Sequence, residues 1–141
     1  NKAAIDHFLK QNKSGAIVNL SSVLAMHPAP SFFSTHAYAA AKAAIIGLST
    51  SSASYYAKDN IRINVISPGL VETPMSVRAR ENDNIMSYIK FKQPLDGGRI
   101  GNANDVTSIA ALLLSDQTSF ITGQNIAVDG GWSVSEGQYS K

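Results

Sequence analysis

The sequence predicts an α/β protein built on a parallel β-sheet. Two short runs rich in apolar and β-branched residues, 16–20 (AIVNL) and 61–66 (IRINVI), are typical of buried strands. Between them, residues 36–57 contain no proline and consist mainly of Ala, Ser and Ile, which predicts a long helix. Parallel strands need a connection of a dozen or more residues, usually a helix, so this order favours a parallel pair.

Further elements extend the pattern on either side. Residues 1–12 carry apolar side chains at helical spacing, and Gly15 is expected to end that helix. Residues 23–35 hold two prolines and several turn-forming residues, which predicts a loop. The second strand is expected to end at residue 66, because Ser67-Pro68-Gly69 follows it. The remaining predictions are a weakly helical segment over 74–93, a helix over 103–116 capped by Asn104, and a last strand over 125–131 that ends in a glycine turn.

Composition excludes several classes of protein. With 141 residues, of which 44% are apolar and 16% charged, the chain is long enough for one domain with a hydrophobic core. A net charge of +2 is too small to indicate nucleic acid or an anionic membrane as a partner. The chain has no cysteine, and its three histidines lack metal-binding spacing, so no catalytic metal is expected. No membrane span or signal peptide is recognisable, which predicts a cytoplasmic protein.

The predicted strand ends are the places to look for chemistry. In open parallel sheets, ligands bind beyond the carboxyl ends of the strands. These ends carry Ser21-Ser22 after the first strand and Ser67-Pro68-Gly69 after the second. A hydroxyl group at Ser22 could donate a hydrogen bond to a substrate oxygen on which negative charge develops.

Tyr38 and Lys42 lie four residues apart in the predicted helix, within the run 37–42 (AYAAAK). Residues at this spacing share a helix face, with Cβ atoms roughly 5–6 Å apart. A free tyrosine loses its proton only near pH ~10, and an ammonium group about 4 Å away favours the phenolate by about 4 kcal/mol at an effective dielectric of ~20. The pair is therefore able to act as a general acid–base. The alternative is a solvated helix face without a catalytic role, and the neighbouring Ser22 favours catalysis.

Four motifs together resemble the short-chain dehydrogenase/reductase family. They are 15–22 (GAIVNLSS), 38–42 (YAAAK), 61–75 (IRINVISPGLVETPM) and 119–131 (SFITGQNIAVDGG), and they occur in the family's order. The resemblance extends from residue 1 to Trp132. It implies that residues 1–141 form one domain, the carboxyl-terminal part of a doubly wound, parallel-sheet Rossmann-like domain whose amino-terminal part is absent. It also implies hydride transfer between a nicotinamide cofactor, NAD or NADP, and a small-molecule alcohol or carbonyl substrate.

The resemblance assigns roles to individual residues. Tyr38 corresponds to the family's proton donor and acceptor and is also expected to contact the cofactor. Lys42 corresponds to the lysine that favours the ionised tyrosine and holds the nicotinamide ribose. Ser22 corresponds to the serine that orients the substrate oxygen, with Ser21 as the second candidate. Pro68, Gly69, Val71 and Thr73 occupy the positions that bind the nicotinamide and its carboxamide. Gly69 also permits the close backbone approach that a flat ring requires, although a plain loop is the alternative interpretation of this turn.

Other features carry weaker predictions. No G-x-G-x-x-G motif is present to hold the adenosine half of the cofactor, so the chain is expected to be part of a longer protein and to expose apolar surface. Residues 74–94 fall where the family has a substrate lid, and a solvated amphipathic helix is the alternative. His27 and His36 flank a long loop on the substrate side and could contact the substrate. Met75 is expected in the core, and contact with the substrate is its alternative. Small residues along 36–57 permit close helix packing, and because this helix builds a subunit interface in the family, the resemblance implies a homodimer or homotetramer. Two further hypotheses are a catalytically inactive binding or scaffold protein with this fold and an inert self-associating fragment.

Overall fold

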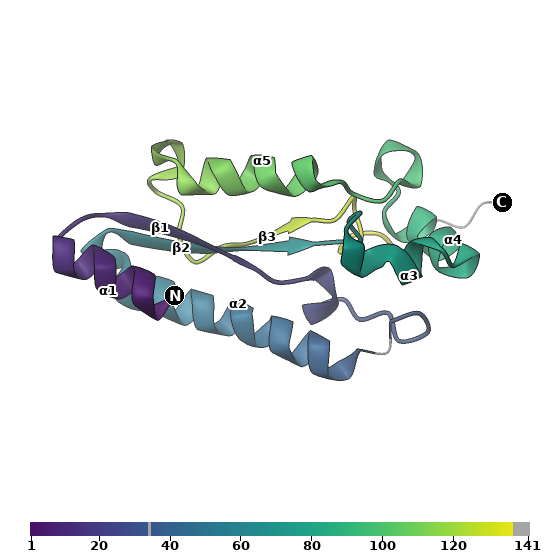
Figure 1. The fold of residues 1–141 in the computed structure, drawn as a ribbon, viewed down its shortest axis with the longest axis horizontal. Coiled ribbons are helices and arrows are strands. Elements are labelled where there is room, and N and C mark those ends of the chain that lie inside the picture. The colour runs from purple at the N-terminus through teal and green to yellow at the C-terminus, as the bar shows by residue number, and fades with distance from the viewer. Residues whose placement is uncertain (34, 137–141) are drawn as a thin grey trace.

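The computed structural model describes residues 1–33 and 35–136 and shows a three-layer α/β arrangement (Figure 1). A parallel sheet has the strand order β1-β2-β3, with β1 at Gly15–Leu20, β2 at Ile61–Pro68 and β3 at Asn125–Val128. The helices are α1 (Lys2–Gln11), α2 (His36–Tyr56), α3 (Val77–Arg80), α4 (Asp83–Lys92) and α5 (Ala103–Leu114). Short 3₁₀ turns lie between these helices and strands, at Val23–Ala25, Ala57–Asp59, Pro74–Ser76, Leu95–Gly98 and Asp116–Thr118.

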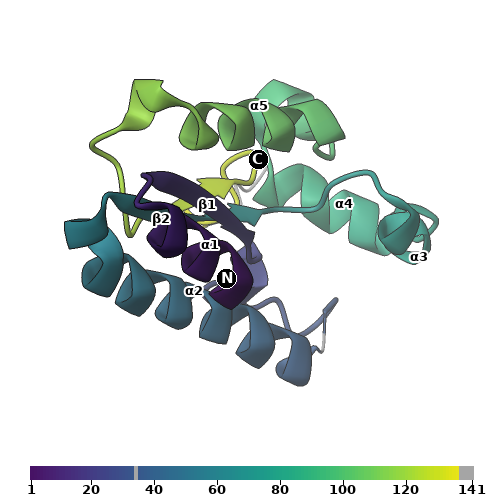
Figure 2. The same cartoon turned by 60° about the vertical axis from the view of Figure 1, so that its left-hand side comes forward.

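The helices cover the sheet from both sides. Helices α1 and α2 lie against one face and α5 against the other, as the two views agree (Figures 1 and 2). Helices α3 and α4 lie beyond the carboxyl end of β2, at one end of the molecule. The predicted parallel sheet with a helical crossover through α2 is therefore confirmed.

The strand register aligns the two carboxyl ends. Gly15 pairs with Ile61 and Leu20 with Ile66 along β1 and β2, and Val65 to Pro68 pair with Asn125 to Val128. The strand β2 thus runs two residues beyond its predicted end, through Ser67 and Pro68. Pro68 is tolerated because the Val65 and Gly69 N–H groups face β3, whereas the nitrogen of Pro68 faces β1, whose pairing with β2 ends at Ile66.

Buried isoleucines of β2 hold the layers together. Ile61 and Ile63 are fully buried against Ile5 of α1 and Ala53 of α2. A second buried cluster lies at the other end of the molecule and joins the 23–33 loop, α3, α4 and Trp132; it consists of Val23, Ala29, Ala79, Ile85, Ile89 and Trp132. The second cluster supports the region in which the predicted site residues lie.

The residue predicted to end the first helix and the residue predicted to cap the last helix were both wrong. Helix α1 ends at Gln11 and is capped by Asn12, which adopts the left-handed conformation (φ 51°), and Gly15 belongs to β1. Gly15 is needed there because a Cβ atom would lie 2.3 Å from the Phe8 ring. Helix α5 is capped by Asn102 rather than Asn104, because Asp105 accepts a hydrogen bond from the Asn102 N–H and completes a reciprocal capping box.

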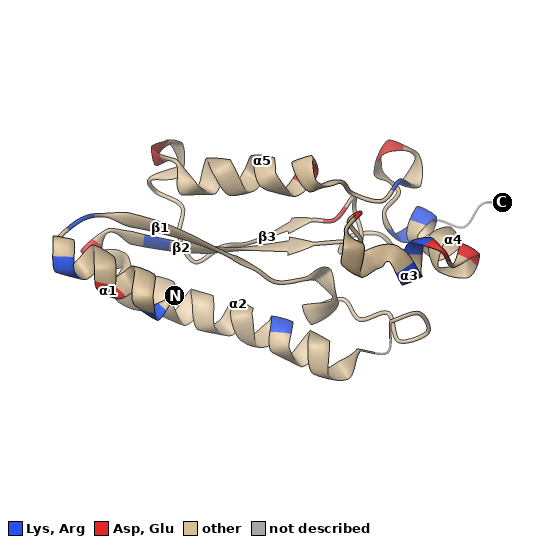
Figure 3. Cartoon of the chain, in the orientation of Figure 1, with Lys and Arg blue, Asp and Glu red and all other residues tan. Residues whose placement is uncertain are grey.

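The surface is partly apolar and mixed in charge. Large side chains are exposed on several elements, among them Leu20, Leu48, Tyr55, Leu95 and Phe120. Basic and acidic residues are interspersed along the chain (Figure 3). Within residues 1–33 and 35–136, no helix has the length and apolar character needed to cross a membrane.

Candidate active site

The carboxyl end of β1 places two buried serines beside α2. The Ser21 N–H continues the sheet by donating to Ile66 O at 2.8 Å, and its hydroxyl donates to Lys42 O at 2.8 Å. Ser21 therefore joins the strand end to α2. Ser22 is 7% exposed, and its Oγ accepts a hydrogen bond from the Leu24 N–H at 3.2 Å. No described residue accepts a hydrogen bond from the Ser22 hydroxyl, which leaves its proton available to a ligand.

Tyr38 and Lys42 are brought together on α2 as their spacing predicts. The Lys42 ammonium group lies 5.6 Å from the centre of the Tyr38 ring. Lys42 Nζ also donates to Leu20 O at 3.0 Å, so the last carbonyl of β1 fixes the position of the charge. Tyr38 is 40% exposed, and its hydroxyl forms no hydrogen bond with any residue that the structure describes. Ser22 and Tyr38 are not hydrogen-bonded to each other.

The segment after β2 forms a second, closely held strand end. The Gly69 N–H donates to Val128 O at 3.1 Å, and Val71 pairs with Gly101 in a parallel bridge. In that bridge the Gly101 N–H donates to Leu70 O at 2.9 Å and the Glu72 N–H to Gly101 O at 2.8 Å. The N–H and C=O groups of Val71 itself have no partner in the described part of the chain. One residue thus presents an adjacent donor and acceptor to a ligand.

Thr73 stands where this segment turns into the helical region. It precedes the 3₁₀ turn at Pro74–Ser76, and its N–H donates to the Ser76 hydroxyl at 3.0 Å. Thr73 is exposed, as is the neighbouring Met75 at 88%, so the prediction that Met75 lies in the core was wrong. The chain leaves the sheet at this point, and the side chain of Met75 has no apolar layer to enter.

Ion pairs and hydrogen bonds hold in place the segment around Gly101, which pairs with Val71. Arg99 donates to Asp105 at 2.7 and 3.1 Å and to Asp96 at 2.6 Å, and the Asn102 N–H donates to Asp105 at 2.7 Å. Hydrogen bonds from Arg99 and then from Asn102 lower the pKa of Asp105 from 3.8 to about 2. The same two carboxylates, Asp105 first, raise the pKa of Arg99. Asp105 therefore links the cap of α5 to the segment around Gly101.

This network predicts a pH dependence of stability. Because the pKa of Asp105 is lower in the folded state, its stabilising contribution is fully present above pH 3.8 and is lost as the pH falls through about 2. Asp105→Asn should therefore be less stable than wild type at neutral pH, and the difference should shrink between pH 4 and pH 2. Thermal unfolding of both proteins across that range measures the difference. A gap between the two that is independent of pH would contradict the assignment.

The predicted substrate-side loop and lid are joined by aromatic contacts. Phe32 stacks on Tyr88 of α4 with ring centres 4.3 Å apart, and Tyr88 meets Trp132 edge-on at 5.7 Å. The Trp132 indole N–H donates to His27 O at 3.3 Å. Burial raises the pKa of Tyr88. His27 and His36 have exposed side chains at the two ends of the loop. The predicted lid over 74–94 is thus two short helices, α3 and α4, separated at Asn82, which caps α4.

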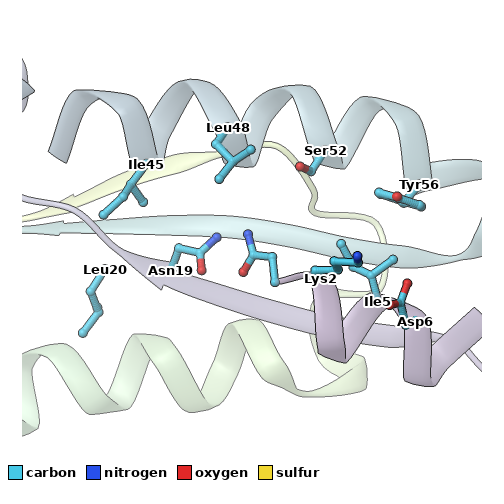
Figure 4. Close-up of a pocket in the computed structure, with 10 residues that line it drawn as sticks. Lys2, Ile5, Asp6, Asn19, Leu20, Ile45, Leu48, Ser52 and Tyr56 are labelled. Atoms are coloured by element: carbon cyan, nitrogen blue, oxygen red, sulfur yellow. The ribbon is translucent and has the colours of Figure 1, made fainter. Parts of the chain in front are cut away.

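The structure also contains a pocket that is separate from the predicted site residues. It has a volume of about 480 Å³ and lies between α1 and α2, over the exposed end of β1 (Figure 4). Its walls carry Lys2, Ile5 and Asp6 from α1, Asn19 and Leu20 from β1, and Ile45, Leu48, Ser52 and Tyr56 from α2. None of the predicted site residues lines this pocket.

Comparison with known proteins decides the family. The family model described as enoyl-(acyl carrier protein) reductase matches residues 1–133. A solved short-chain type dehydrogenase/reductase from Mycobacterium ulcerans superposes with a TM-score of 0.87 at 33% identity, over 96% of this chain and 47% of that one. The chain belongs to the short-chain dehydrogenase/reductase family. The predicted Rossmann-like α/β fold is confirmed with it.

Two other members of the short-chain dehydrogenase/reductase family are similarly close. The 3beta-hydroxysteroid dehydrogenase 1 of Eggerthella lenta is 38% identical over 136 residues, which are 96% of this chain and 50% of that protein. A structure of 4-hydroxyisoleucine dehydrogenase complexed with NADH superposes with a TM-score of 0.87 at 36% identity, over 96% of this chain and 54% of that one. The chain spans about half the length of the relatives it matches.

The structure also reveals residues that the sequence did not single out. Gln93 is buried between α4 and the segment after β2, and Asp129 accepts hydrogen bonds from the Gly131 and Ser133 N–H groups at 2.9 and 2.8 Å. The family resemblance extends to Trp132 but assigns no role to it. A polar residue near the end of a weakly helical segment has no local pattern that marks it as buried, so Gln93 is found only from its tertiary contacts.

Proposed function

We propose that this chain supplies the catalytic and nicotinamide-binding residues of an NAD(H)- or NADP(H)-dependent oxidoreductase that interconverts a small alcohol and a carbonyl compound. The single observation that carries the proposal is the pair of Tyr38 and Lys42, with the lysine fixed on Leu20 O. The relatives support it, because they include a 3beta-hydroxysteroid dehydrogenase and a dehydrogenase solved with NADH.

Three side chains perform the proton chemistry in this proposal. Tyr38 donates its hydroxyl proton to the carbonyl oxygen during reduction and removes the alcohol proton in the reverse direction. Ser22 donates a hydrogen bond to the same oxygen, for which its hydroxyl proton is available. Lys42 places a positive charge beside the Tyr38 ring and stabilises the phenolate that remains after proton transfer. The cofactor, when bound, supplies or accepts the hydride.

The segment after β2 fits the nicotinamide end of such a cofactor. A carboxamide carries an NH2 group that donates and a C=O group that accepts, which match the C=O and N–H of Val71 that have no partner among the described residues. Pro68 and Gly69 bring the chain to this point, and Thr73 ends the segment at the start of the helical region. Lys42 uses one of its three N–H donors on Leu20 O, so two remain for the ribose hydroxyls.

Exposed apolar side chains on α2 favour self-association of the protein. Leu48 and Tyr55 of α2 are 60% and 65% exposed, and burial of such side chains against a second copy would stabilise an assembly. We therefore expect a homodimer or homotetramer of the full-length protein, in which residues 1–141 belong to one Rossmann-like domain.

A ligand-binding experiment followed by an activity screen tests the function. The full-length protein is heated with and without NADH and NADPH, and a dinucleotide present at 100 times its Kd should raise the free energy of unfolding by about 2.7 kcal/mol. The dinucleotide that binds is then used with sugars, secondary alcohols and steroids while the absorbance of the reduced nicotinamide is followed. Failure of both dinucleotides to raise the melting temperature would contradict the proposal and favour a scaffold protein.

A further inference from the structure

Gln93 is a buried side-chain amide that contacts the segment after β2. It follows the last residue of α4 and is 2% exposed. Its Oε1 accepts a hydrogen bond from the Leu70 N–H at 2.6 Å, and its Nε2 donates to Leu70 O at 3.3 Å and to Arg99 O at 3.5 Å. One side chain thus serves both peptide groups of Leu70, as a neighbouring strand would. This amide is costly to remove, because the Leu70 N–H would lose its only partner among the described residues.

Gly69 is shaped to accept this side chain. A Cβ atom at Gly69 would lie 2.6 Å from Gln93 Oε1 and 3.1 Å from Asp129 Cα. Gly69 does not have a positive φ, so its backbone conformation alone would admit other residues. The close approach of Gln93 and Asp129 is therefore what requires glycine at this position.

The hydrogen bonds of Gln93 and Gly101 with the residues on either side of Val71 together set the direction of the Val71 peptide groups. In a trans peptide, the Leu70 C=O and the Val71 N–H point in opposite directions in one plane, and no cis peptide occurs in the described residues. Gln93 Nε2 and the Gly101 N–H hold the Leu70 C=O, so the Val71 N–H points away from them. The Glu72 N–H, held by Gly101 O, directs the Val71 C=O to that same free side.

We propose that Gln93 is a positioning residue that orients the Val71 N–H and C=O toward the carboxamide of the nicotinamide. The inference rests on the proposed function, and it concerns only one end of the cofactor. Without the Gln93 amide, the Leu70 N–H loses its described partner and the Leu70 C=O keeps only the hydrogen bond from the Gly101 N–H. The Leu70–Val71 peptide is then held less firmly, which weakens the contact with the nicotinamide. Binding of the adenosine and phosphate groups does not involve this peptide and is unaffected.

The test compares a complete dinucleotide with one that lacks the nicotinamide ring. Gln93→Met, which keeps the side-chain length but removes both hydrogen-bonding groups, is made in the full-length protein. Wild type and variant are titrated with NADH and with ADP-ribose, or with NADPH and 2′-phospho-ADP-ribose if the protein prefers NADP. We expect the Kd of the dinucleotide to rise about 5- to 10-fold, as the loss of about one hydrogen bond implies, and that of the ADP-ribose ligand to change by less than about twofold.

Asn64→Leu is the matched control. Asn64 is 1% exposed in β2, accepts a hydrogen bond from the Gln124 N–H at 3.0 Å and donates to Ile121 O at 2.9 Å, so its loss also leaves two backbone groups unpaired. This variant should lose stability as Gln93→Met does, without a change in the ratio of the two Kd values. If Gln93→Met does not fold, Gly69→Ala, whose Cβ would displace the Gln93 amide, should show the same selective loss.

The outcomes separate this inference from the function on which it depends. A selective rise in the Kd of the dinucleotide supports the positioning role. Equal losses for both ligands, or no loss for either, would overturn the role of Gln93 and leave the oxidoreductase proposal standing. A wild-type protein that binds neither ligand would overturn the proposed function together with the inference.

Discussion

Tyr38→Phe is expected to lower the kcat of the full-length protein by about 10²- to 10⁴-fold, the contribution typical of a general acid–base. The substitution removes only the hydroxyl, which has no hydrogen-bonding partner among the described residues, and it keeps the ring beside Lys42. Stability and the Kd of the dinucleotide should therefore stay close to their wild-type values. Steady-state kinetics, dinucleotide titration and thermal unfolding of the same preparation measure the three quantities.

The chain offers a matched control for this substitution. Tyr55 lies on the same helix, is exposed, and has the Lys58 ammonium group 5.0 Å from its ring centre. The second pair has the same two functional groups, but Tyr55 lies at the other end of α2 and Lys58 in the turn that follows, away from the carboxyl ends of the strands. Tyr55→Phe should leave kcat unchanged. A Tyr38→Phe variant with nearly wild-type kcat would refute the role of Tyr38.

Lys42→Met is expected to lower kcat by about 10²-fold and to weaken dinucleotide binding as well. Removal of the ammonium group takes away both the charge that stabilises the phenolate and the donors available to the ribose. It also leaves Leu20 O without its hydrogen bond from Nζ, so a small loss of stability accompanies the change. Kinetics and titration against the Lys58→Met control measure the effect.

Lys42→Arg separates the effect of the positive charge from the effect of the Nζ contact with Leu20 O. It keeps the positive charge, yet a planar guanidinium group does not reproduce the single Nζ contact with Leu20 O. We expect a kcat between those of wild type and Lys42→Met. A Lys42→Met variant that lost neither kcat nor affinity would contradict the assignment of Lys42 to the site.

Local sequence patterns were sufficient to predict the main helices and strands and the Tyr38–Lys42 pair of the candidate site. The β-branched runs in β1 and β2 and the proline-free α2 are recognisable without tertiary information, because strand and helix preferences act over a few residues. The spacing of Tyr38 and Lys42 is likewise local, since the geometry of one helix places them on the same face. Even the cap of α5 had a local signal, the Asn102-x-x-Asp105 box, that outweighed the predicted Asn104.

Side chains that act across long separations were decided only by the tertiary structure. Gln93 meets Leu70 across 23 residues, and Trp132 meets His27 across 105, so no local pattern indicates either contact. Gly69 shows the difference most clearly: the sequence suggested a backbone open to a flat ring, whereas the structure shows that the Gln93 amide occupies the space of its missing Cβ. The sequence by itself determined the fold class, the α2 pair and the strand ends. Only folding decided which buried groups hold those strand ends in place, because a hydrogen bond between distant segments depends on how the layers pack.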